Sequence, residues 1–225
     1  MRSTKGAAEP LTIAVDSQRV SGLLIAPDDA RACYVLAHGA GAGMTHPFMA
    51  AIANALAQRG VATLRYQFPY MEQRSKRPDS PKVAHAAVRA AVDAAARRLP
   101  NLPLFAGGKS FGGRMTSQAQ AEAALPGVRG LVFLGFPLHP AGRPSDERAQ
   151  HLADVRIPML FLQGTRDALA ELSLLRPVIC RLRDRATLAL FEDADHSFHV
   201  RGASTDGDAM SRLAEAIAHW VGLQR

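Results

Sequence analysis

Hydrophobic and polar positions alternate along the chain in two recurring patterns. Short runs such as residues 32–37 (ACYVLA) and 158–163 (PMLFLQ) are apolar almost throughout, which is typical of parallel strands that are covered on both faces. Longer stretches repeat apolar residues every three or four positions and predict amphipathic helices. The apolar runs predict strands over residues 11–15, 20–26, 32–37, 61–66, 102–107, 128–136, 158–163 and 186–191. The amphipathic stretches predict helices over residues 47–59, 81–99, 114–124, 169–183 and 208–223.

The repeated alternation of strands and helices predicts an α/β fold with a doubly wound, mostly parallel sheet. A short polar turn separates the first two strands, which therefore predict an antiparallel N-terminal hairpin. Residues 137–155 form the one loop-rich stretch and hold at most a short helix, so no cap domain is expected. The chain has no linker or repeat, and residues 1–225 are expected to form a single domain.

The composition is that of an ordinary globular protein, with 48% hydrophobic and 21% charged residues. No apolar run approaches the roughly 18 residues that span a membrane, and the first ten residues lack the apolar core of a signal peptide. We therefore expect a cytoplasmic protein that does not enter membranes. Cys33 and Cys180 both fit buried thiols, and neither has the spacing of a redox motif or a zinc site.

The net charge of +7 comes mostly from arginine. Such a charge could serve an acidic partner, but the arginines are scattered along the chain. The tightest basic group, residues 74–77 (RSKR), has no interleaved aromatic residues on which bases could stack. The composition therefore favours a solvated basic surface over nucleic-acid binding.

Residues 108–112 (GKSFG) carry the main chemical signal. A G-x-S-x-G pentapeptide between a strand and a helix holds its serine on a sharp, strained turn, where glycines avoid collisions with the neighbouring backbone. Ser110 is therefore the candidate nucleophile for acyl transfer. The pentapeptide alone is a weak signal, and its interpretation depends on the partners that follow.

Residues 38–43 (HGAGAG) follow a predicted strand and let the backbone approach a bound group. Acyl transfer needs two N–H donors for the developing oxyanion. We expect one from Phe111, directly after the nucleophile, and one from Ala40, with Gly41 as the alternative. The loop lacks the spacing of a phosphate-binding motif. His38 is interpreted as a structural residue that hydrogen-bonds this loop.

Two further segments supply a base and an acid. His196 lies in the loop after the last predicted strand, and Asp167 lies just after the strand over residues 158–163. A carboxylate there can reach the far nitrogen of the histidine, fix its tautomer and stabilise the imidazolium. Asp193 or Asp195 could orient the histidine instead. His199 is a competing base.

Ser110, Asp167 and His196 follow different apolar strands, so all three are expected at the carboxyl edge of one sheet, where open α/β sheets place their active sites. Their chain order is that of the α/β-hydrolases. The sequence resembles that superfamily over nearly its whole length. More narrowly, it resembles small, lidless bacterial hydrolases related to the testis-expressed protein 30 and KAT8 regulatory complex subunit 3 family. The matching segments are residues 38–49, 65–70, 107–115, 162–167 and 194–198.

The chain is more distantly similar to dienelactone hydrolases, which carry a cysteine nucleophile where this chain has Ser110. The resemblance implies an α/β-hydrolase fold and a serine hydrolase. The parts identified imply no metal or organic cofactor. Thioesterases and lactonases share this machinery, and a non-catalytic binding or scaffold protein on the same fold is the alternative from another class. The sequence leaves the oligomeric state open.

The absence of a lid predicts an open, shallow site for small or short-chain esters. The candidate pocket residues follow strands at the same edge: Phe68 and Tyr70, which could instead cap the core, His139 at the pocket mouth, and Lys109. Lys109 and Arg65 could favour an anionic substrate. For Lys109, a solvated side chain that points away from the pocket is the preferred interpretation.

Overall fold

The computed structural model describes residues 7–200 and 206–224, with side chains described from Ala209 onward in the last segment. Within this part, eight strands form one sheet in the order β1-β2-β4-β3-β5-β6-β7-β8. The strands are β1 (Glu9–Val15), β2 (Gln18–Ile25), β3 (Ala32–Ala37), β4 (Val61–Tyr66), β5 (Leu104–Lys109), β6 (Val128–Leu134), β7 (Met159–Gly164) and β8 (Ala186–Phe191). The helices are α1 (Pro47–Ala57), α2 (Pro69–Glu72), α3 (Pro81–Arg98), α4 (Phe111–Glu122), α5 (Leu172–Leu182) and α6 (Asp206–Leu223), with 3₁₀ helices η1 (Glu147–Asp154) and η2 (Arg183–Arg185).

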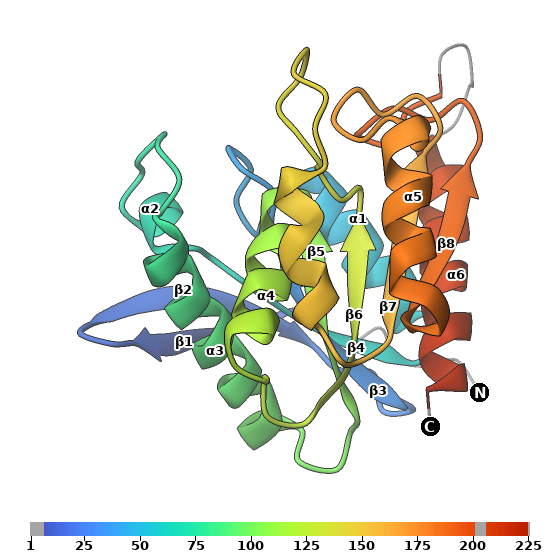
Figure 1. Ribbon diagram of the computed structural model, residues 1–225. Helices are drawn as coiled ribbons and strands as arrows, with labels where there is room; N and C mark the ends of the chain where they lie inside the picture. Colours follow the sequence, from blue (N-terminus) through green and yellow to red (C-terminus); the bar gives the residue numbers. More distant parts are fainter. Residues whose placement is uncertain (1–6, 201–205, 225) are drawn as a thin grey trace.

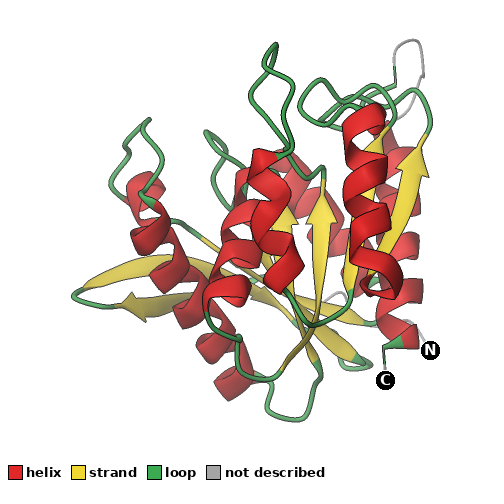
Figure 2. Cartoon of the chain, in the orientation of Figure 1, coloured by secondary structure: helices red, strands yellow, loops and turns green. Residues whose placement is uncertain are grey.

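The sheet is mostly parallel, as the pattern of strands and helices predicted, and it has the arrangement that the resemblance to α/β-hydrolases implied. β1 pairs antiparallel with β2, and β2 pairs antiparallel with β4. Every pair from β4 to β8 is parallel, so the sheet is mostly parallel with an N-terminal hairpin at one end. In Figure 2 the arrowheads of the central strands point toward one edge, where the loops gather.

Helices cover both faces of the sheet (Figure 1). On one face, α3, α4 and α5 pack with η1 over a core that includes Phe133 and Phe161. On the other face, α1 and α6 pack over a second core that includes Phe105 and Trp220. Both faces of the central strands are therefore buried, which explains why those strands are continuous apolar runs.

The segment between β6 and β7 contains only η1, which packs against α4. As predicted, this segment contributes a short helix and no cap. The carboxyl edge of the sheet is therefore open on the side where many related folds insert a helical domain.

Several boundaries differ from those predicted. α4 begins at Phe111, directly after the serine, because the turn from β5 is a single residue long. α5 begins at Leu172 because the Asp167 side chain accepts from the N–H of Leu169, which holds the preceding residues in a turn. The short helix α2 was not predicted. It begins at Pro69, where proline is well suited to a first helical position.

The two thiols differ in exposure. Cys33 lies in β3 and is buried, whereas Cys180 lies on the exposed face of α5. The expectation of a buried Cys180 is therefore wrong. Val178, only two positions away, faces the core, and two positions of a helix are about 200° apart.

None of the described helices combines the length and the apolar character needed to cross a membrane. The expectation about the N-terminus concerns residues 1–10, and residues 1–6 lie outside the described part of the chain.

Candidate active site

Ser110 sits on the sharp turn between β5 and α4 with φ of 50° and ψ of −114°, a conformation that costs a non-glycine residue about 1–3 kcal/mol. The neighbouring glycines permit this turn because nothing larger fits. A Cβ at Gly108 would lie 2.2 Å from the carbonyl oxygen of Ala37, and a Cβ at Gly112 would lie 2.6 Å from that of His38. The close approach of α4 to β3 therefore raises the serine above the sheet edge.

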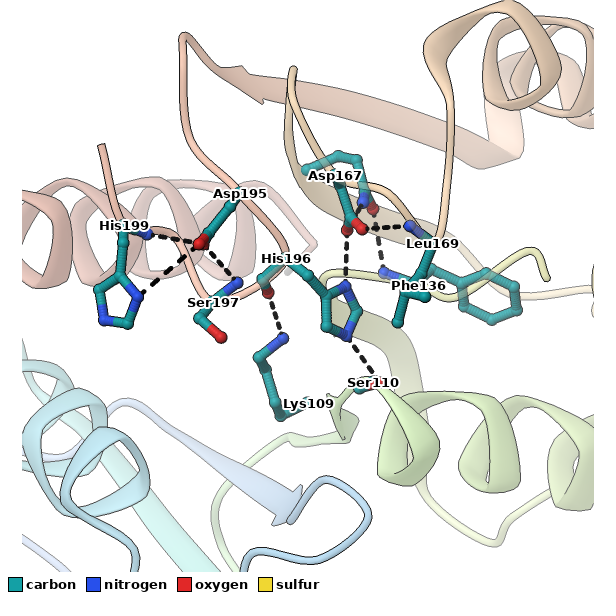
Figure 3. A network of polar contacts seen from close by, with 10 residues as sticks. Lys109, Ser110, Phe136, Asp167, Leu169, Asp195, His196, Ser197 and His199 are labelled. Atoms are coloured by element: carbon teal, nitrogen blue, oxygen red, sulfur yellow. Dashed lines mark hydrogen bonds and ion pairs between the residues drawn. The ribbon is translucent and has the colours of Figure 1, made fainter. Parts of the chain in front are cut away.

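Ser110, His196 and Asp167 form one continuous chain of hydrogen bonds (Figure 3). The serine Oγ lies 2.8 Å from Nε2 of His196, and Nδ1 of His196 lies 2.7 Å from Oδ2 of Asp167. An ionised carboxylate only accepts, so Nδ1 carries the proton and Nε2 accepts from the serine hydroxyl. The Asp167 side chain is fully buried, whereas that of His196 is 23% exposed.

Asp167 is itself held by two donors besides the histidine. Its Oδ1 accepts from the N–H of Leu169 at 2.8 Å, and its Oδ2 accepts from the side-chain amide of Gln163. The other end of that amide accepts from the N–H of Phe136 at 3.0 Å. Gln163 thus ties the carboxylate to the segment that follows β6. The sequence reasoning missed this residue, although a polar residue near the end of a fully buried strand is a signal that could have found it.

The other candidate acids do not contact the histidine ring. Asp195 accepts from the backbone N–H groups of Ser197 and His199 and so caps its own turn (Figure 3). Asp193 is exposed and lies 4.0 Å from Arg166. Asp167 is therefore the carboxylate that the structure brings to His196.

His38 has the structural role predicted for it. Its Nε2 accepts from the N–H of Phe68 at 3.1 Å, so its Nδ1 donates to the carbonyl of Gly39 at 2.8 Å. Burial lowers the pKa of His38 to about 4, which keeps the ring neutral and able to accept. This pair of bonds fixes the loop that follows β3. A Cβ at Gly39 would lie 3.8 Å from the Cβ of Ser110, so this loop lies against the candidate nucleophile.

The loop after β3 holds both candidates for the second oxyanion donor, the N–H groups of Ala40 and Gly41. The N–H of Gly41 donates to the hydroxyl of Tyr70, which removes the alternative donor. Ala40 lines the pocket beside Ser110. Phe111 is the first residue of α4, and N–H groups in the first turn of a helix have no partner within the helix.

Three of the predicted pocket residues do not line the pocket. Phe68 and Tyr70 are buried and pack edge-on against Phe111, so they support the turn from below and cap the core. His139 is fully buried, with Nδ1 against the carbonyl of Pro140. Side chains that follow a strand can turn back into the core, and these three do.

Arg65 does not reach the pocket either. It is buried, and it donates to the carbonyl of Met44 at 3.0 Å. Its guanidinium therefore holds the backbone after the glycine-rich loop, and its suggested role with an anionic substrate is wrong.

The pocket beside Ser110 has a volume of about 660 Å³. Drug-sized ligands occupy pockets of roughly 300–1,000 Å³, so this site has room for one such molecule. Its walls come from the loop after β3, the start of α1, the histidine loop and α6. The lining residues are Gly39, Ala40, Ala42, His46, Pro47, Phe48, Met49, Ala51, Lys109, Ser110, Leu169, His196, Ser197, Phe198, His199, Ala209 and Met210.

Lys109 belongs to this wall, and the expectation of a solvated side chain is wrong. The half-buried side chain donates to the main-chain carbonyl of His196 (Figure 3). Its Nζ also lies 5.9 Å and 5.6 Å from the ring centroids of Phe48 and Phe198. Loss of hydration lowers the pKa of Lys109 to about 8.

Fold and site together define an α/β-hydrolase with a serine, a histidine and a carboxylate at hydrogen-bonding distances on the carboxyl edge of its sheet. Among the described residues, no group of three or more His, Cys, Asp or Glu side chains is placed to hold a metal. Residues 30–222 match the family model described as "Alpha/beta hydrolase domain", and the chain belongs to that family.

Solved structures with the same fold include several hydrolases. Dienelactone hydrolase from Anabaena variabilis superposes with a TM-score of 0.80 at 21% identity, covering 97% of this chain and 98% of that one. An α/β serine hydrolase without a lid from Xanthomonas campestris has a TM-score of 0.74 at 22% identity, covering 96% and 95%. The esterase domain of a Rhodothermus marinus protein has a TM-score of 0.73 at 17% identity, covering 95% and 97%. The chain is thus a hydrolase-fold protein with esterases among its structural neighbours.

Proposed function

We propose that the protein is a serine hydrolase that cleaves small carboxylic esters through an acyl-enzyme on Ser110. The observation that carries this proposal is the chain of hydrogen bonds from Ser110 through His196 to Asp167. A serine hydroxyl is a weak nucleophile until a neighbouring base accepts its proton. Nε2 of His196 is positioned for that role, and Asp167 holds the tautomer that leaves Nε2 free to accept.

In this mechanism, Ser110 Oγ attacks the ester carbonyl while His196 Nε2 takes the hydroxyl proton. The N–H groups of Phe111 and Ala40 stabilise the negative charge on the former carbonyl oxygen, each contributing about 3–4 kcal/mol. The tetrahedral intermediate collapses, the C–O bond to the alcohol breaks, and His196 returns the proton to the leaving oxygen. Water then attacks the acyl-enzyme by the same route, and the acid leaves.

The proposed substrates are small because the pocket has room for one drug-sized molecule and no cap to enclose a long chain. Short-chain esters fall within that class. Thioesters and lactones present the same electrophilic carbonyl to the same groups, so the acyl class is decided by comparing all three. A preference for long-chain over short-chain nitrophenyl esters would contradict the proposed size.

Labelling with a fluorophosphonate probe tests the proposed nucleophile. The probe phosphonylates an activated serine, so the protein should be labelled and Ser110→Ala should not be. Ser173→Ala, on the exposed surface of α5, is the matched control and should be labelled like the unaltered protein. Labelling of Ser110→Ala at the unaltered level would remove Ser110 from its proposed role, and no labelling of either would favour a non-catalytic hydrolase-fold scaffold.

We further propose that the protein is related in function to the lidless hydrolases of the testis-expressed protein 30 and KAT8 regulatory complex subunit 3 family. Segments 38–49 and 107–115 support this, because they form the loop after β3 and the serine turn in the structure. Both segments include residues that line the pocket beside Ser110.

A further inference from the structure

The titratable side chains that line the pocket are all basic. Lys109, His46, His196 and His199 line it, and no aspartate or glutamate among the described residues does. Two helices also begin here: α1 directly after His46, and α4 directly after Ser110. The N-terminus of a helix favours negative charge. An anionic group would therefore meet a favourable field in this pocket.

Lys109 supplies an ammonium group to this wall. An ammonium has three N–H donors, and the carbonyl oxygen of His196 takes one of them. The rings of Phe48 and Phe198 stack on each other and lie beside the ammonium as its apolar surroundings. Within the described part of the chain, no carboxylate lies at ion-pair distance from Lys109. The ammonium thus has donors to spare at the wall of the pocket.

The protonation state of Lys109 suits an anion. Loss of hydration lowers its pKa to about 8, and the more distant carboxylates of Asp167 and Asp195 act in the opposite direction. The side chain is therefore mostly cationic at neutral pH, although part of its hydration has been lost. A partly desolvated charge interacts more strongly with an incoming anion than a solvated one does.

The bond to His196 does not by itself require a charge. A neutral amide could donate to the same carbonyl without the free-energy cost of burying an ammonium. The stem of Lys109 passes the glycine-rich loop, since a Cβ at Gly39 would lie 3.5 Å from its Cγ. The cation is thus held between the proposed oxyanion loop and the histidine loop, next to the proposed nucleophile.

We propose that Lys109 binds an anionic group of the substrate, so that the preferred substrates are esters bearing a second, ionised carboxyl group. The inference rests on the proposed function, because the ester bond must reach Ser110 while the carboxylate meets Lys109. Hydrogen bonds to charged groups are strong enough to favour such esters about tenfold to a hundredfold over neutral ones of the same shape.

Matched pairs of esters test the recognition of an anionic group by Lys109. In each pair, one ester carries a carboxylate and the other carries an uncharged carboxamide at the same position. Monomethyl glutarate against methyl 4-carbamoylbutanoate places the charge on the acyl side. 3-Acetoxybenzoate against 3-acetoxybenzamide places it on the alcohol side. The measured quantity is the ratio of kcat/KM for the acid to that for the amide, which is expected to reach about tenfold or more in at least one pair.

Two substitutions separate recognition from positioning. Lys109→Gln keeps a donor for the His196 carbonyl but removes the charge, and Lys109→Met removes both. Both variants should bring the ratio of kcat/KM values to about one. Lys109→Gln should still cleave the ester bond of the carboxamide-bearing substrates. Lys109→Arg should keep part of the preference. The control is Lys76→Met, an exposed lysine on the loop after α2, which should behave like the unaltered protein.

The outcomes distinguish the inference from the proposed function. Fluorophosphonate labelling of every variant is measured first, since it reports a reactive serine whatever the ester preference. No labelling and no ester turnover would overturn both ideas. Labelling with a ratio near one in both pairs would overturn only the role of Lys109. A ratio unchanged in Lys109→Gln, or an equal loss on acid and amide in both variants, would assign Lys109 to the histidine loop alone and overturn the recognition.

Discussion

Replacing Asp167 by asparagine keeps the size of the side chain but exchanges one carboxylate oxygen for an NH₂ group. In the unaltered protein, both carboxylate oxygens of Asp167 accept hydrogen bonds. Oδ1 accepts from the N–H of Leu169, and Oδ2 accepts from His196 and Gln163. An amide nitrogen in either place would therefore face a donor. No orientation of the asparagine restores the present set of hydrogen bonds.

Each orientation has a cost that can be stated. With NH₂ at the Oδ2 position, Nδ1 of His196 must accept, so Nε2 carries the proton and cannot take one from Ser110. That tautomer lowers kcat by roughly 10³–10⁴-fold. With NH₂ at the Oδ1 position, it meets the Leu169 N–H in the buried interior, at about 1–3 kcal/mol. We expect the first orientation, which keeps the hydrogen bond from Leu169, and therefore a loss of kcat of roughly 10³–10⁴-fold. The free energy of unfolding should also decrease, because the new NH₂ group faces the side-chain amide donor of Gln163.

Initial rates with 4-nitrophenyl acetate give kcat, and urea unfolding gives the stability. Gln163→Glu, measured alone and combined with Asp167→Asn, completes a double-mutant cycle between these two positions. The carboxylate introduced by Gln163→Glu can accept from the new NH₂ group, so the double variant should recover stability. It should not recover kcat, because the histidine tautomer is still wrong. Activity of Asp167→Asn within tenfold of the unaltered protein, or recovery of kcat in the double variant, would refute this account of the tautomer.

Two further predictions concern the turn and the response to acid. Gly112→Ala should lower activity and decrease the free energy of unfolding by about 1–3 kcal/mol, because its Cβ would lie 2.6 Å from the His38 carbonyl; Gly222→Ala, with nothing within 4 Å, is the control in thermal unfolding and rate assays. Burial lowers the pKa of His151 to about 4, so between about pH 6.5 and 4 the unfolded state binds more protons and stability falls as the pH falls. His151→Gln should make the decline of Tm over this pH range shallower. An unchanged dependence of Tm on pH would contradict a lowered pKa of His151.

The sheet and the meeting of three distant residues could be predicted from the sequence because both depend on local signals. Ser110, Asp167 and His196 each follow an apolar run, and parallel strands end at a common edge. The chain order then leaves few arrangements open. The glycines around the serine could be understood in the same way, as sites where a side chain would collide with a neighbouring strand.

The pocket lining could not be predicted in this way, because its walls come from segments far apart in the sequence. Phe48 begins α1, Phe198 follows the histidine, and Met210 lies in α6. Which side chains of these segments meet depends on how the helices pack on the sheet. A position after a predicted strand also did not show whether a side chain enters the core or the pocket. Phe68 turns into the core, whereas Lys109 lines the pocket.

Ser110 and His196 are 86 positions apart, and His196 follows β8, the last strand of the sheet. A chain emerging from the ribosome therefore carries its hydroxyl long before it carries the group that would activate it. Reactivity can arise only after the final strand has joined the others. In a refolding experiment, the return of probe labelling would thus time the meeting of the serine turn and the histidine loop.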